Sequence, residues 1–340
     1  MYKNYVSSNQ YIKTVELNNK KFTSLDDLDN IQKEYSKGIR VKQALNIDLS
    51  KPENRLYSRW SVNSNERFTI KSNMDGQKIV FERWLADMEH QIRNIYSDDN
   101  HTKILSKEKR TKNYYTNVLF FSKNNKVYAC ILAKDKNIVN NVMSLINLTN
   151  INLSSSPLST DERIIEWIFW RGMTNKKLME PSDSSFDERV EIDNLYSFKG
   201  NDELGNGDDL ISGKSPQVTD LDVTKAVLSL NDPLNAAMIA LNWKGSELKF
   251  VYSMNGSVII SMNNSFLNSD ISMQSTKNKY VDTYEKIIYI VALIIPKLLD
   301  LFNSDSQKFI TDFDEFKQTS AKYLIKKLMN VNNIDINDIK

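Results

Sequence analysis

Residues 236–262 constrain the fold more than any other part of this chain. Three strand-like runs, 236–243, 247–254 and 257–262, are separated by Lys-Gly-Ser and by the pair Asn255–Gly256. An Asn-Gly pair between two such runs is typical of a tight hairpin, in which both turn residues adopt positive φ angles. The segment therefore predicts a three-strand antiparallel meander over 236–262.

Other segments show further strand and helix signals. A second hairpin is predicted from Tyr114–Phe121 and Lys126–Ala133, with its turn at Asn124–Asn125. Apolar residues at three- and four-residue intervals, together with capping signals, predict helices in both halves of the chain. The predicted helices cover 24–45, 77–96, 137–148, 159–173, 224–230, 280–302 and 310–329, whereas 175–220 is expected to be irregular with one or two strands.

This order of elements predicts an α+β fold of two lobes, in which antiparallel strand meanders pack with helices. The Ser-rich stretch 154–159, which contains Pro157, is the expected linker. The first lobe is then a basic N-terminal α+β lobe over 1–153. The second is a C-terminal α+β lobe over 154–340, which holds the meander of 236–262 and two terminal helices.

Charge is divided unevenly along the chain. Residues 1–126 carry 23 Lys and Arg against 15 Asp and Glu, whereas residues 127–340 carry 22 against 28. The densest basic stretch runs into two tyrosines; basic side chains neutralise phosphates, and exposed tyrosines stack on bases. The predicted nucleic-acid-binding residues are Lys103, Lys107, Lys109, Arg110, Lys112, Tyr114 and Tyr115, and Lys107, Lys109, Arg110 and Lys112 are expected to share one exposed surface.

Two alternatives stay open for this basic stretch. It can be an ordinary solvated loop, with Tyr114 and Tyr115 beginning a strand and pointing to opposite faces. It can also dock on the acidic region 180–209 of the same chain, because opposite charges within one chain attract.

The sequence offers little for catalysis, so no catalytic residue, metal or cofactor is predicted and the chain is expected not to be an enzyme. Its two histidines, His90 and His101, are too few for a multi-histidine metal site and are expected at the surface. The run Gly213-Lys214-Ser215 lacks the earlier glycine of a phosphate-binding loop.

One catalytic alternative remains, a metal-dependent nuclease. Glu247 and Lys249 alternate on one strand face, so that the carboxylate can hold a metal while the lysine lies near the attacking water. Asp222 or Asp232 is the expected second carboxylate.

Two apolar segments indicate whether the chain can bind a protein partner or a membrane. Residues 164–170 are apolar nearly all round, so Trp167 and Trp170 are expected either in the core or against a protein partner or second copy. The run Ile287–Ile295 is about half the length that spans a bilayer, which predicts a buried helix kinked at Pro296 and no membrane contact. The single cysteine, Cys130, is expected as a buried strand residue.

Together these observations predict a cytoplasmic, non-enzymatic component that binds nucleic acid or protein. The first 13 residues lack the apolar stretch of a signal peptide, and one cysteine suits a reducing compartment. The 39 asparagines, with abundant Lys and Ile, indicate an AT-rich coding source. A bacterial phage-defence or mobile-element system is therefore the expected setting, with the nuclease and an oligomeric scaffold as alternatives.

Overall fold

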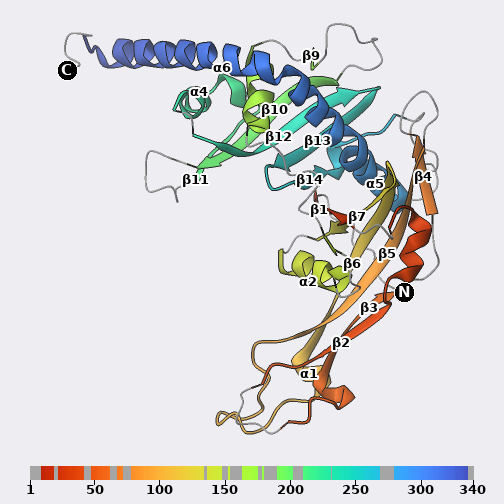
Figure 1. Cartoon of the computed structure of the whole chain (residues 1–340). Coiled ribbons are helices and arrows are strands. Elements are labelled where there is room, and N and C mark those ends of the chain that lie inside the picture. Colours follow the sequence, from red (N-terminus) through yellow and green to blue (C-terminus); the bar gives the residue numbers. More distant parts are fainter. Residues whose placement is uncertain are drawn as a thin grey trace. The chain divides into compact units, whose positions relative to one another are not determined.

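The computed structural model contains two compact units, one between Tyr11 and Pro157 and one containing Leu158–Lys340. We call them the N-terminal and C-terminal units. Strands pair antiparallel and pack with helices in both, which confirms the predicted α+β class (Figure 1). The structure describes residues 9–18, 22–41, 47–61, 67–71, 78–133, 136–147, 152–153, 163–174, 178–179, 190–201, 210–230, 232–268 and 279–335.

The N-terminal unit is built on an antiparallel sheet with the strand order β1-β7-β6-β5-β3-β2, to which β8 adds beside β1 and β4 beside β5. Its helices are α1 (Lys107–Arg110) and α2 (Lys136–Asn147). The strands are β1 (Asn9–Asn18), β2 (Glu34–Gly38), β3 (Arg55–Ser61), β4 (Arg67–Lys71), β5 (Lys78–Gln91), β6 (Thr111–Lys123), β7 (Lys126–Leu132) and β8 (Asn152–Leu153).

The predicted hairpin of β6 and β7 is confirmed. Asn124 and Asn125 form its two-residue turn with φ angles of 52° and 56°, a conformation that asparagine tolerates better than most residues. Helix α2 is also confirmed. It lays Val139, Val142 and Ile146 on the sheet face that carries Trp84 and Phe120, and these residues form the core of the unit.

The helix predicted over 77–96 is wrong, because this segment is the strand β5. Its neighbours β3 and β6 pair with it on either side, and both of its faces are largely buried. A strand buried on both faces is apolar at nearly every position, so the apolar residues also fall at helical intervals by coincidence.

The helix predicted over 24–45 is wrong as well, although its start is correct. Ser24 precedes a short 3-10 helix, Leu25–Asn30, and its backbone N–H donates to the Asp27 carboxylate at 2.8 Å. The chain then becomes extended at Ile31 and enters β2, whose pairing with β3 satisfies the backbone groups that a helix would have used.

The C-terminal unit has the strand order β11-β10-β12-β13-β14, with β9 beside β10. The predicted meander over 236–262 is confirmed by the antiparallel pairing of β12 with β13 and of β13 with β14. The elements are α3 (Ile164–Met173), β9 (Leu178–Met179), β10 (Val190–Asn201), β11 (Leu210–Lys214), α4 (Asp222–Ser229), β12 (Leu234–Trp243), β13 (Ser246–Ser253), β14 (Ser257–Ser261), α5 (Lys279–Tyr289) and α6 (Ile295–Asn332).

The two turns of the meander differ from each other. Lys244 and Gly245 both have positive φ, 50° and 71°, and form the two-residue turn between β12 and β13. At the second turn Gly256 has a φ of 71°, whereas Asn255 is not among the residues with positive φ. The expectation that both residues of this pair adopt positive φ is therefore wrong; the connection is a three-residue loop that ends in a left-handed glycine.

Helix α3 is confirmed, and its apolar residues are buried by the chain itself. Trp167 and Trp170 are 0% and 1% exposed and contact Phe302 and Phe309 of α6 at ring-centroid distances of 5.7 and 5.5 Å. The Trp167 indole N–H donates to Asp305 at 2.8 Å. These two tryptophans are thus not available to a second chain, which removes the surface that the self-association hypothesis used.

The two predicted C-terminal helices form one continuous helical stretch. The run Ile287–Ile295 is buried as predicted, and a π-helical turn, Ile290–Ile294, directly precedes Pro296. Such a widened turn accommodates proline, which has no N–H and would crowd the carbonyl four residues earlier. The stretch Val281–Asn332 is long and apolar enough to cross a membrane, but 61% of its apolar window is buried inside the protein, as in a core helix.

We predict that Gly256→Val lowers the free energy of unfolding by about 1–2 kcal/mol, because a β-branched residue resists the left-handed conformation. Gly256→Asn is the matched control and should cost clearly less, since asparagine tolerates positive φ. Urea unfolding followed by circular dichroism measures both variants. Equal destabilisation by valine and asparagine would contradict this explanation.

We predict that Cys130 does not react with a thiol reagent at pH 8 while the protein is folded. The side chain is 0% exposed, and burial raises the pKa of its thiol to about 12, so the reactive thiolate is scarce. Labelling with a chromogenic disulfide should therefore proceed only in guanidinium. Rapid stoichiometric labelling of the native protein would show that β7 is accessible.

Candidate anion-binding site

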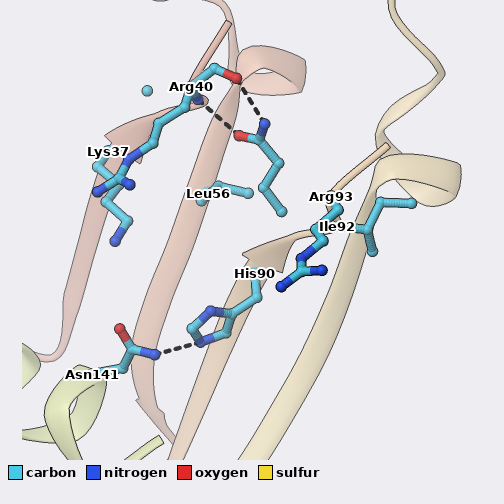
Figure 2. A pocket seen from close by; sticks show the side chains of 9 residues that line it. Lys37, Arg40, Leu56, His90, Ile92, Arg93 and Asn141 are labelled. Atoms are coloured by element: carbon cyan, nitrogen blue, oxygen red, sulfur yellow. Dashed lines mark hydrogen bonds between the residues drawn. The ribbon is translucent and has the colours of Figure 1, made fainter. Parts of the chain in front are cut away.

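A pocket of about 400 Å³ lies in the N-terminal unit, where β2, β3, β5 and α2 come together. We call it the basic pocket. Figure 2 shows Lys37 and Arg40 on one side, Arg93 on the other, and His90 with Asn141 near the base. Its lining residues are Lys37, Gly38, Arg40, Leu56, His90, Gln91, Ile92, Arg93 and Asn141.

Strand pairing determines the floor of the basic pocket. Lys37 of β2 lies directly across from Leu56 of β3, which is buried. His90 continues the face of β5 that holds Trp84, because alternate residues of a strand share a face. Helix α2 covers this face, and its Asn141 side chain places Nδ2 at 3.1 Å from His90 Nε2. The pocket therefore opens at the edge of the covered core.

Gln91 holds the rim in place. Its side-chain carbonyl accepts the Arg40 backbone N–H at 2.7 Å, and its side-chain N–H donates to the Arg40 carbonyl at 2.7 Å. This pair of bonds works like one rung of a sheet and fixes the loop that follows β2. On the opposite rim, the Ile92 backbone N–H donates to the Arg110 carbonyl at 2.9 Å, which anchors the segment that carries Arg93.

The charged side chains that line the pocket are all positive. Lys37, Arg40 and Arg93 are exposed, and none of them forms an ion pair with the residues that the structure describes. None of the nine lining residues is acidic. Three cations around a concave surface raise the local concentration of anions, because a cleft focuses the field of its charges.

The predicted basic-aromatic residues do not form one surface. Arg110 is 3% exposed and donates to the Leu105 carbonyl at 2.6 Å, to the Glu53 carbonyl and to Asn54 Oδ1 at 3.0 Å. Its role is to hold three chain segments together. The expectation that Arg110 shares an exposed surface with Lys107, Lys109 and Lys112 is therefore wrong.

Lys107 is also engaged inside the unit. Its ammonium forms an ion pair with Glu89 at 2.8 Å and lies 4.5 Å from the centre of the Tyr57 ring. Glu89 points to the face of β5 opposite His90, so Lys107 lies away from the basic pocket. Lys103 and Lys109 are exposed, and the Lys103 backbone N–H donates to Asp98 at 3.0 Å.

Lys112 and Tyr114 are the two predicted residues on the face of the basic pocket. Lys112 lies across the β5–β6 ladder from His90, and the Tyr114 ring meets the His90 ring edge-on at a centroid distance of 4.9 Å. Tyr114 is 37% exposed. Tyr115, on the opposite face, lies across from Asp87. The tyrosines therefore point to opposite faces, as one alternative expected.

Sequence reasoning missed the residues that line the basic pocket. Lys37, Arg40 and Arg93 are isolated in the sequence, and His90 was expected only as a surface histidine without a site. The only signal for them was the overall basic excess of residues 1–126, which does not identify individual side chains.

The residues of the nuclease alternative line a different pocket, of about 300 Å³, in the C-terminal unit. Glu247 and Lys249 share it with Asp193 and Tyr196, and the Lys249 ammonium lies 3.4 Å from the centre of the Tyr196 ring. The expected second carboxylates are elsewhere, since Asp222 pairs with Lys327 and Asp232 is buried. Within the described ranges no three His, Cys, Asp or Glu residues group as metal ligands.

Comparison with known proteins assigns no function to this site. No protein-family model matches the chain, and no curated protein matches its sequence. The function is therefore argued from the geometry of the basic pocket.

We predict that Arg110→Ala lowers the free energy of unfolding by about 2 kcal/mol or more, because it leaves the buried Asn54 side chain and two partly buried carbonyl groups without this donor. Lys109→Ala is the matched control on the same short helix and should change stability by less than about 0.5 kcal/mol. Chemical unfolding of the three proteins measures this difference. A small effect of Arg110→Ala would contradict the structural role of this guanidinium.

Proposed function

We propose that this protein is a non-enzymatic nucleic-acid-binding component whose N-terminal unit receives a phosphate in the basic pocket. The observation that carries the proposal is the set of three cations, Lys37, Arg40 and Arg93, around a concavity without a carboxylate. Surface lysines and arginines usually have acidic neighbours or are scattered over convex surfaces, where they only keep a protein soluble.

The chemistry of the lining suits phosphate oxygens. Arg40 and Arg93 each present a planar group of N–H donors that can bind two oxygens at once, while Lys37 adds a compact charge. The volume of about 400 Å³ is within the range of small-molecule sites, so a nucleotide-sized group can enter.

A nucleic acid fits better than an isolated phosphate because the basic surface continues beyond the pocket. Lys112 and Tyr114 extend it along β6 on the same face. An exposed aromatic ring beside cations is typical of proteins that bind single strands, where bases stack on the ring and lysines neutralise the backbone. The setting in a bacterial phage-defence or mobile-element system stays an expectation from composition.

We predict that Arg93→Glu weakens binding of short DNA and RNA at least tenfold, and that Arg40→Glu together with Arg93→Glu weakens it further. The weakening should be similar for all sequences, because phosphate contacts carry no base information. The slope of log affinity against log salt should fall by about 0.7–0.9 for each phosphate that the variant no longer neutralises. Fluorescence anisotropy over a salt series measures both quantities.

Lys78→Glu is the matched control for Arg93→Glu, since it makes the same charge change at the exposed other end of β5. It should leave the affinity within about twofold. Absence of binding to DNA and RNA at low salt would overturn the proposal and favour a protein partner. Cleavage of the same oligonucleotides with Mg²⁺, abolished by Glu247→Gln, would instead support the nuclease alternative.

A further inference from the structure

The basic pocket carries more positive charge than one phosphate inside a nucleic-acid strand can neutralise. Lys37, Arg40 and Arg93 are exposed, and none of the residues that line the pocket is acidic. Among the residues that the structure describes, none forms an ion pair with these three cations. The energy of an anion in their field is proportional to the charge of that anion, so a ligand with two negative charges gains about twice as much as a ligand with one.

The two kinds of phosphate in a nucleic acid differ in this charge. A phosphodiester inside a strand carries about one negative charge and has two free oxygens. A phosphomonoester at the end of a strand carries a charge of about −1.5 to −2 near pH 7 and has three free oxygens. Each of the two guanidinium groups can bind two oxygens, and the Lys37 ammonium adds further donors. The lining therefore offers donors for every free oxygen of a terminal phosphate.

Hydrogen bonds join the walls of the pocket on two sides. Between α2 and β5, Asn141 Nδ2 lies 3.1 Å from His90 Nε2. Between β5 and the loop after β2, the Gln91 side chain forms two bonds of 2.7 Å with the Arg40 backbone. The last residue of a strand can enter a pocket with joined walls through a single opening. An internal phosphate would have to bring both of its flanking nucleotides through that opening.

The surface beside the pocket suits the nucleotides that adjoin a strand end. The Tyr114 ring meets the His90 ring edge-on at a centroid distance of 4.9 Å, and Lys112 lies across the β5–β6 ladder from His90. Both Tyr114 and Lys112 are exposed, so a base can stack on the ring while the lysine neutralises the next phosphate. These two residues favour a strand end over a free mononucleotide, which has no second nucleotide to place on them.

We propose that the basic pocket binds a phosphomonoester at the end of a single nucleic-acid strand. This inference rests on the proposed function and specifies which kind of phosphate the pocket receives. Lys37, Arg40 and Arg93 bind the terminal phosphate, and Lys112 and Tyr114 bind the adjoining nucleotides. Affinity then depends on the presence of a terminal phosphate and not on sequence, because phosphate contacts carry no base information.

The test compares short single-stranded oligonucleotides of one sequence that carry a 5′-phosphate, a 3′-phosphate or no terminal phosphate. We expect one of the phosphorylated strands to bind at least about tenfold more tightly than the hydroxyl-ended strand, since a hydrogen bond to a charged group contributes that factor or more. Adenosine monophosphate should bind more weakly than this phosphorylated strand. Competition against an internally labelled, phosphorylated strand, followed by fluorescence anisotropy at low salt, measures all four affinities.

Two double variants separate the pocket from the surface beside it. Lys37→Gln with Arg93→Gln should reduce the preference for the phosphorylated strand to about twofold or less, because the doubly charged group loses more energy than the singly charged one. Lys109→Gln with Lys112→Gln is the matched control, since it removes the same number of charges from exposed side chains outside the pocket lining. It should weaken binding of all strands by a similar factor and leave the preference unchanged.

The outcomes distinguish this inference from the proposed function. Equal binding of phosphorylated and hydroxyl-ended strands would overturn the inference and leave the proposed function intact, whereas failure of every strand to bind would overturn both. Adenosine monophosphate that binds as tightly as the phosphorylated strand would overturn the choice of a strand end. A preference that survives Lys37→Gln with Arg93→Gln would overturn the assignment of the phosphomonoester to this pocket.

Discussion

The N-terminal unit depends on the pairing of β5 with β6, which runs from Phe81 opposite Phe121 to Gln91 opposite Thr111. This ladder places Trp84 in the core and, farther along the same face, His90 at the edge of the basic pocket. It also puts Lys112 and Tyr114 on that face. A slip of one residue would move every side chain of one strand to the other face, so the register of this pair determines which charges meet.

Burial separates the charged residues into two groups. Arg110 and Lys107 lie where water is partly or wholly excluded, and a charge there must be compensated, so they are bound by carbonyl oxygens or by Glu89. Lys37, Arg40 and Arg93 are at the rim, where water solvates them and no compensation is needed. The positive charge that remains for a ligand is therefore not where the basic residues are densest in the sequence.

In the C-terminal unit, helix α6 packs in the core along its first part and is covered on only one side along its last part. The first part of α6 is held by α3, through Trp167 against Phe302 and through the ion pair of Arg171 with Asp305 at 2.6 Å. Farther on, α4 is the described neighbour, and it covers only one side of α6. A helix that continues beyond its core keeps its backbone hydrogen bonds but has no neighbour to cover its apolar residues, and Leu328 and Val331 are accordingly exposed.

Local interactions explain which parts of this protein could be predicted from the sequence. The meander over 236–262, the Asn124–Asn125 turn and helices α2, α3 and α4 depend on turn conformation and on apolar spacing within one segment. Strand β5 could not be recognised, because its two buried faces hide the two-residue period until β3 and β6 are paired with it. Lys112 and Tyr114, predicted as nucleic-acid-binding residues, lie on the face of the basic pocket, but the pocket itself was not predicted. Its residues come from β2, β3, the end of β5 and α2, and only tertiary pairing brings these distant segments together.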